Sequence, residues 1–172
     1  EQAKPTIAQL FYDVGIHVLA GPPGCGKTWI ALNACLSVVP ALQIPGSVET
    51  APFAVYLDLD GNVTMHQRAI GLGATREALK RRDVDIVSVP AEAHDRGQGL
   101  VATLWEMVKT MAEDPNPPRV VVIDSMSRVV AESGEDSNNS DGVTRIMNRL
   151  QPLADRCCVI VLDHTGHAEP DR

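Results

Sequence analysis

The stretch GPPGCGKT, residues 21–28, follows directly after a short apolar run and precedes a segment with helical character. Glycine adopts backbone conformations that other residues avoid, and it lets backbone N–H groups approach a ligand closely. The N-terminus of a helix favours anions, because its first N–H groups have no partner within the helix. A strand, a glycine-rich turn with a cation and then a helix therefore predict a cradle for phosphate groups.

This stretch also matches a specific pattern, G-x-x-x-x-G-K-[ST], through Gly21, Gly26, Lys27 and Thr28. We expect backbone amides from Gly24 to Thr28 to surround a β-phosphate. Lys27 is predicted to reach the β- and γ-phosphates and act in catalysis, and the Thr28 hydroxyl to bind Mg²⁺. The nucleotide-binding residues predicted from the motif are Gly21, Pro22, Pro23, Gly24, Cys25, Gly26, Lys27, Thr28 and Trp29.

Five short apolar runs predict strands of a parallel sheet that is covered on both faces. These runs are residues 15–20, 53–59, 84–89, 119–124 and 157–163. Helical spacing of apolar residues predicts helices from residue 101 to 111 and from 143 to 154, and the nearly uniform apolar character of 29–39 predicts a central, buried helix. Alternating strands and helices indicate an α/β fold, a three-layer sandwich with a mainly parallel sheet.

Polar stretches rich in glycine and proline separate these elements. They predict loops at 40–52, 90–99, 113–118 and 132–142. The last of these is acidic and follows a strand end, where open α/β sheets place their ligand sites. A solvated loop without a function is the alternative for this segment.

Composition narrows the class of protein. With 44% hydrophobic and 22% charged residues, the 172-residue chain is typical of a globular domain. The net charge of −7 weighs against a general binder of polyanions, because such binders neutralise phosphates with lysine and arginine. No apolar run approaches the roughly 20 residues that span a bilayer, so we expect no membrane segment and a cytoplasmic location.

Magnesium beside a triphosphate keeps several waters and is held by few carboxylates, so we expect a second motif, an apolar strand that ends in an acid. Two runs have this form: VVVID ends at Asp124 and VIVLD ends at Asp163. We favour Asp124 as the metal ligand, together with Thr28, because Ser125, Ser127 and the polar loop follow it directly. The alternative is that either residue is an ordinary acid at a strand end.

Hydrolysis also requires a group that activates water. The run YLDLDGN ends the second predicted strand, and the alternation of side chains places Tyr56, Asp58 and Asp60 on one face of it. Asp60 lies nearer the predicted mouth of the site, so we favour it over Asp58 as the catalytic base. A further possibility is that neither carboxylate is catalytic.

The final apolar strand is followed by DHTGH, which places His164 and Thr165 at a strand end. If this strand lies between those of Gly21 and Asp124, His164 faces the γ-phosphate and reports its presence. A metal site made by His164 and His167 is less favoured, because no cluster of acids or cysteines supports it.

Four segments together resemble the RecA-like ATPase core: HVLAGPPGCGKTWIALNAC, VYLDLDGN with HQRA, VVVIDSMSRVV with GEDSNN, and VIVLDHTGH. Within that class they are similar to the plasmid- and phage-associated ATPases related to hexameric RepA-type replicative helicases, and the similarity covers nearly the whole chain. The resemblance implies that Lys27 and Thr28 hold the phosphates and Mg²⁺ and that Asp124 is the acid on the metal side. It further implies that Asp60 stands in the place of a catalytic glutamate and that His164 senses the γ-phosphate.

The same resemblance implies a strand order in which residues 157–163 separate the two strands that carry nucleotide motifs. It also implies assembly of identical chains into a ring, such as a hexamer, with ATP at the subunit boundaries and single-stranded DNA as a partner. Two departures from the family pattern stand out. Asp60 is one methylene shorter than glutamate, which predicts slow turnover. His167 stands where the family has a basic residue, and the family pattern continues into an arginine-bearing segment and further strands that this chain is expected to lack, with Arg172 at best a remnant.

We therefore expect residues 1–172 to form a single RecA-like ATPase domain, shortened at its C-terminus, that binds and hydrolyses ATP with Mg²⁺ in DNA replication or recombination. Two alternatives stay open. One is a P-loop kinase of small molecules, although Arg81, Arg82 and Arg96 are too scattered to form the arginine-bearing lid it requires. The other is a nucleotide-dependent assembly switch that does not hydrolyse ATP.

Overall fold

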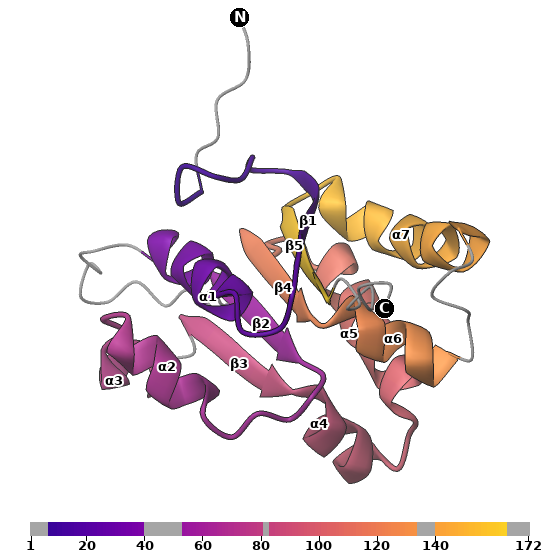
Figure 1. Cartoon of the computed structure of the whole chain (residues 1–172), viewed down its shortest axis with the longest axis horizontal. Helices are drawn as coiled ribbons and strands as arrows, with labels where there is room; N and C mark the ends of the chain where they lie inside the picture. Colours follow the sequence, from indigo (N-terminus) through magenta and orange to yellow (C-terminus); the bar gives the residue numbers. More distant parts are fainter. Residues whose placement is uncertain (1–6, 40–52, 81–82, 134–139, 165–172) are drawn as a thin grey trace, which may run out of the picture.

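The computed structural model describes residues 7–39, 53–80, 83–133 and 140–164. Within these residues, five strands form one sheet in which every pairing is parallel. The strands are β1 (Gly15–Gly21), β2 (Ala54–Asp58), β3 (Val84–Ser88), β4 (Val120–Asp124) and β5 (Cys158–His164). Each corresponds to one of the five apolar runs, so the predicted parallel α/β sheet is confirmed (Figure 1).

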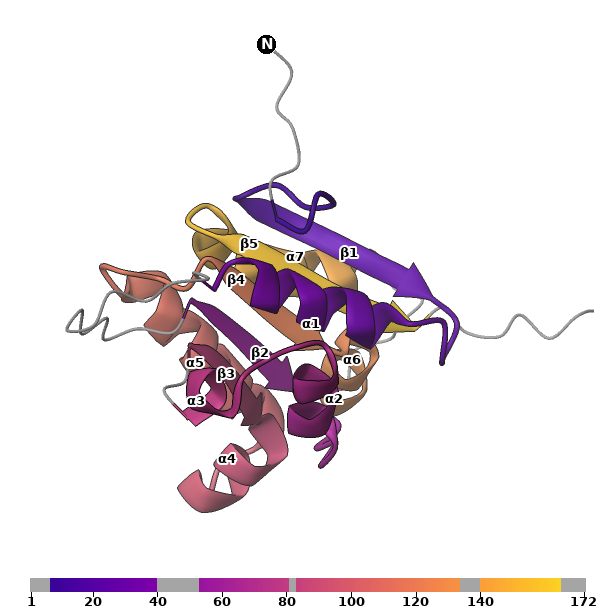
Figure 2. The same ribbon diagram turned by 90° about the vertical axis from the view of Figure 1, so that its left-hand side faces the viewer.

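Helices cover both faces of this sheet. Helices α1 (Lys27–Ser37), α2 (Met65–Gly71) and α3 (Arg76–Lys80) lie on one face (Figure 2). The other face is covered by α5 (Leu100–Glu113), α6 (Met126–Ser133) and α7 (Ser140–Ala154), while α4 (Val89–Arg96) follows β3 and contacts α5. The predicted three-layer sandwich is therefore confirmed.

Side-chain alternation along each strand separates the core into two parts. In β2, Val55 and Leu57 belong to the core shared with α5, α6 and α7, whereas Tyr56 belongs to the core shared with α1 and α2. All three side chains are buried. A central strand with apolar residues on both faces is what a parallel sheet between two helical layers requires.

The strand order is β1-β5-β4-β2-β3, so β5 lies between β1 and β4 as the family resemblance implies. Parallel pairing brings the carboxyl ends of neighbouring strands to the same edge of the sheet, where α/β proteins bind ligands. The register places Gly21 of β1 opposite His164 of β5, and Asp58 of β2 opposite Asp124 of β4. Four strands therefore deliver their last residues to one small region.

Helix α1 begins two residues earlier than predicted and is buried on one side only. Ala31, Leu32, Ala34 and Cys35 face the sheet, but Trp29 is 46% exposed. The expectation of a helix buried all round is wrong, because α1 belongs to an outer layer of the sandwich and turns its second face to solvent.

Helix α4 occupies residues for which the sequence predicts a loop, 90–99. Pro90 lies in the first turn of this helix. An N–H group there has no acceptor within the helix, so the missing N–H of proline costs no helical hydrogen bond. Gly97 ends it with φ 64°, and its N–H donates to His94 O at 3.1 Å. The loop prediction is wrong because a proline and a glycine that cap the two ends of a helix also resemble turn signals.

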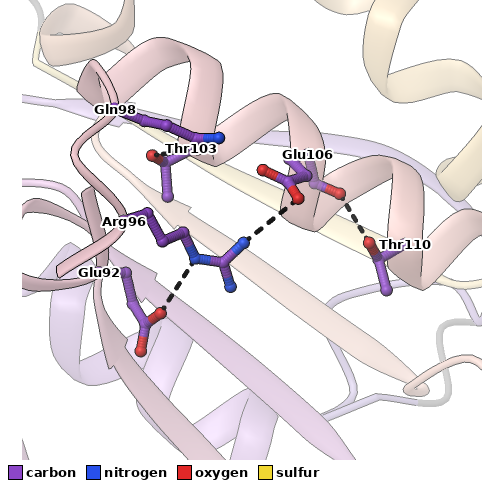
Figure 3. A network of polar contacts seen from close by, with 6 residues as sticks. All are labelled: Glu92, Arg96, Gln98, Thr103, Glu106 and Thr110. Atoms are coloured by element: carbon purple, nitrogen blue, oxygen red, sulfur yellow. Dashed lines mark hydrogen bonds and ion pairs between the residues drawn. The ribbon is translucent and has the colours of Figure 1, made fainter.

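Several polar contacts lie where α4 meets α5, and among them the ion pair of Arg96 with Glu106 joins the two helices (Figure 3). Arg96 Nε contacts Glu92 Oε2 at 3.4 Å, and its Nη1 contacts Glu106 Oε1 at 3.4 Å. Thr103 Oγ1 donates to Gln98 Oε1 at 3.3 Å. Each of these partly exposed ion pairs contributes little stability. Together they hold the Arg96 side chain between α4 and α5.

Candidate active site

The glycine loop turns the chain from the end of β1 into the start of α1. Gly24 and Gly26 have φ values of 78° and 95°, in the left-handed region that strongly favours glycine. A Cβ atom at Gly21 would lie 3.0 Å from Cys25 Sγ, so a larger residue there would require the exposed Cys25 side chain to move aside. The loop conformation thus depends on glycine at positions 24 and 26.

Lys27 is the first residue of α1, and its side chain folds back over the glycine loop. The residue is only 5% exposed. Its Nζ donates to the carbonyl oxygens of Gly21 at 2.6 Å and Pro22 at 2.9 Å, and Cys25 Sγ lies 3.8 Å from it. A buried ammonium group requires such partners, and here the loop carbonyls hold the cation beside the amides predicted to bind phosphate.

The carboxylate of Asp124 lies beside the start of α1. Thr28 Oγ1 donates to Asp124 Oδ2 at 3.4 Å, and the Tyr56 hydroxyl donates to the same oxygen at 2.5 Å. Burial, and then the negative charge of Asp124, raise the pKa of Tyr56 above its usual value, and the neutral hydroxyl is the donor in this pair. The structure therefore brings the two predicted Mg²⁺ ligands, Thr28 and Asp124, within hydrogen-bonding distance of each other.

Three side chains from three strand ends converge next to this contact. One ligand atom each of Asp60, Asp124 and His164 lies within 4.8 Å of the other two. Asp60 is exposed, and the other two residues are half-buried. His164 Nδ1 is buried and has no hydrogen-bond partner among the residues that the structure describes. The structure groups the residues predicted as base, metal ligand and γ-phosphate sensor, and their roles stay predictions.

Asp58, the alternative base, organises the loop that carries Asp60. Its carboxylate accepts hydrogen bonds from the N–H groups of Asp60 and Gly61, each at 3.1 Å, and from that of Asn62. The residue is 4% exposed. Burial raises the pKa of the Asp58 carboxyl group, and the loop N–H groups oppose this shift. Because both of its oxygens serve the loop, the geometry favours Asp60 as the candidate base.

Asp163, the alternative metal ligand, lies on the other side of the sheet. Val161 belongs to the core under α6 and α7, and strand alternation places Asp163 on that same face. Asp124 lies on the α1 face, beside Thr28. The remaining predicted residues of the C-terminal segment are outside the described part of the chain: Thr165, Gly166, His167 and Arg172.

Sequence reasoning placed Tyr56 on the same strand face as Asp58 and Asp60 but assigned it no part in the site. Its contact with Asp124 depends on the register of two strands that are distant in sequence, in which Tyr56 lies opposite Val122. The part that Asp58 plays in the loop was also missed. Its signal is the local pattern of an aspartate followed by Gly61 and Asn62, which is typical of a turn held by a carboxylate.

A strand, a glycine loop with Lys27 and Thr28, and an acidic strand end beside them define a P-loop nucleotide-binding site. The family model described as an AAA domain matches residues 1–170. The chain belongs to this family of AAA-type P-loop ATPase domains, which confirms the prediction of a P-loop ATPase domain. No match was found among curated proteins.

Among the described residues, the helices are too short or too polar to cross a bilayer.

The hydrogen bonds that Asp58 accepts from the following loop predict a contribution to stability. We expect Asp58→Ala to lower the free energy of unfolding by about 1–3 kcal/mol, because the substitution removes the acceptor of three loop N–H groups. The matched substitution Asp60→Ala, at an exposed position, is expected to change it by less than about 0.5 kcal/mol. Urea denaturation of both variants at pH 7 measures the difference. Equal stability of the two would show that the loop does not depend on the Asp58 carboxylate.

Proposed function

We propose that this AAA domain binds ATP with Mg²⁺, hydrolyses it, and acts as a ring-forming motor in DNA replication or recombination, related to the RepA-type helicases. One observation above all supports hydrolysis. The carboxylates of Asp60 and Asp124 and the His164 imidazole lie within 4.8 Å of one another, and Asp124 also contacts Thr28. The role in DNA metabolism and the assembly into rings are inferred from the sequence resemblance.

The residues present fit a magnesium nucleotide. The Thr28 hydroxyl and the Asp124 carboxylate are hard oxygen ligands of the kind that Mg²⁺ prefers, and the ion usually takes only one or two such groups from a protein. When bound, Mg²⁺ would neutralise charge on the phosphate oxygens. The glycine loop, with Gly24 and Gly26 in left-handed conformations, allows backbone N–H groups to approach the same phosphates.

Lys27 is proposed to bind the β- and γ-phosphates. Its ammonium group is already held at the loop by the carbonyl oxygens of Gly21 and Pro22. Little reorganisation is then required when the phosphates are bound, and preorganised charge of this kind stabilises a transition state effectively. The other residues from Pro22 to Trp29 would line the loop around the phosphates.

Asp60 is proposed as the general base. It is exposed at the end of β2, on a loop held by Asp58, and its carboxylate accepts a proton from the attacking water. His164 is proposed as the γ-phosphate sensor. One of its ring nitrogens lies within 4.8 Å of a carboxylate oxygen of Asp60 and of Asp124, which supports a position close to the bound phosphates.

The kinase alternative receives less support from the structure. A kinase of small molecules requires arginines over the phosphates, but Arg96 contacts Glu92 and Glu106 in the packing of α4 and α5. Arg81 and Arg82 lie outside the described residues. The assembly switch is separated from the motor by turnover, since it would bind ATP without releasing phosphate.

The proposed role of Lys27 is tested by Lys27→Ala. We expect this variant to lose ATP binding or hydrolysis while its thermal unfolding stays cooperative, because the loop conformation depends on glycine and not on the ammonium group. Lys109→Ala is the matched control, since the Lys109 side chain is 73% exposed on α5. Fluorescence titration with a labelled nucleotide and phosphate release measure the two activities. Unchanged turnover in Lys27→Ala would refute the assignment.

The proposed role of Asp60 is tested by Asp60→Asn, which keeps the size of the side chain and removes the base. We expect ATP affinity to stay unchanged and the hydrolysis rate to fall by roughly 10²- to 10⁴-fold, the usual effect of losing a general base. Asp95→Asn, at an exposed position of α4, serves as the control. A normal rate in Asp60→Asn would remove this residue from the catalytic mechanism.

The role in DNA metabolism is tested by steady-state phosphate release with Mg²⁺, with and without single-stranded DNA. We expect DNA to increase the rate, because nucleic-acid motors couple hydrolysis to contact with the strand. Parallel reactions contain candidate small-molecule acceptors. Phosphorylation of an acceptor would favour the kinase, and tight ATP binding without turnover would favour the assembly switch.

A further inference from the structure

Tyr56 belongs to β2, and its side chain is fully buried in the core between the sheet and α1. Its hydroxyl donates to Asp124 Oδ2 at 2.5 Å. Hydrogen bonds between a hydroxyl and an ionised carboxylate are short and roughly twice as strong as those between neutral groups. Among the described residues, the shorter of the two hydrogen bonds to this carboxylate therefore comes from β2, a different strand from the one that carries Asp124.

The hydrogen bonds from described residues to the Asp124 carboxylate converge on one of its two oxygens. Tyr56 donates to Oδ2 at 2.5 Å, and Thr28 donates to the same atom over a longer distance of 3.4 Å. Oδ1 receives no hydrogen bond from the residues that the structure describes. A carboxylate fixed through one oxygen presents the other in a defined direction.

The environment of Tyr56 is suited to fixing a neighbour. A tyrosine ring has two side-chain torsion angles, and here its burial on β2 restrains both. The parallel pairing of β2 with β4 sets the distance, because Tyr56 lies opposite Val122, two residues before Asp124. The hydroxyl is therefore held by the sheet itself and not by a loop.

We propose that Tyr56 is a positioning residue for the metal site, which holds the Asp124 carboxylate in the orientation that binds Mg²⁺. In this proposal it acts through Asp124 and is not itself a ligand of the metal or the nucleotide. Metal-binding side chains are commonly oriented by a second hydrogen-bonded group, and its removal typically weakens metal binding by roughly 10- to 100-fold. The inference rests on the proposed function, because it takes Asp124 as a metal ligand.

Tyr56→Phe tests this role, since it removes the hydroxyl and keeps the buried ring. Tyr12→Phe is the matched control at a residue that is 44% exposed. Electron paramagnetic resonance measures Mn²⁺ binding to the protein with a non-hydrolysable ATP analogue, without any turnover. We expect Tyr56→Phe to weaken Mn²⁺ binding about tenfold and to raise the Mg²⁺ concentration for half-maximal hydrolysis by a similar factor. Metal-free nucleotide affinity should stay unchanged, and Tyr12→Phe should change none of these values.

The outcomes separate this inference from the proposed function. If the wild-type protein binds Mn²⁺ with the analogue and Tyr56→Phe binds it equally well, the positioning role is overturned and the proposed function stands. If Tyr56→Phe loses metal-free nucleotide binding or cooperative thermal unfolding, Tyr56 is a structural residue and the positioning role is again overturned. If the wild-type protein itself binds no Mn²⁺ with the analogue, the proposed metal site and the role of Tyr56 both fail.

Discussion

The placement of β4 between β5 and β2 is the constraint on which the candidate site depends. β4 ends at Asp124, and its neighbours on either side deliver His164 and the loop that carries Asp60. Parallel pairing makes these strands end at the same edge, so the three groups converge although they are far apart in sequence. The Tyr56 hydroxyl donates to Asp124, the last residue of β4, so a buried side chain of β2 directly contacts the candidate site.

The two aspartates at and just after the end of β2 lie in different environments. Asp58 is buried, and its carboxylate accepts hydrogen bonds from three N–H groups of the following loop. Asp60 is exposed and lies next to Asp124 and His164. A buried acceptor thus supports an exposed carboxylate two residues away, and the arrangement explains why an apolar strand carries two acids so close together.

Local sequence patterns were sufficient for the sheet and the glycine loop, because apolar runs and the spacing from Gly21 to Thr28 reflect local requirements. They were insufficient for α4, since Pro90 and Gly97 act as helix caps here and resemble turn signals in isolation. Helix α6 has a buried stripe of Met126, Val129 and Val130 that is too short to stand out as a period. The contact of Tyr56 with Asp124 could not be derived locally, because it depends on the register of β2 against β4.

The glycine loop follows β1, and among the described residues β1 pairs with β5 alone. Gly15 lies opposite Cys158. β1 is therefore synthesised long before β5, the strand with which its backbone pairs. Contacts between such distant segments form late in folding, because closing a long loop costs entropy before the contact repays it. The backbone of β1, which leads into the glycine loop, therefore gains its partner in the sheet only after β5 has been synthesised.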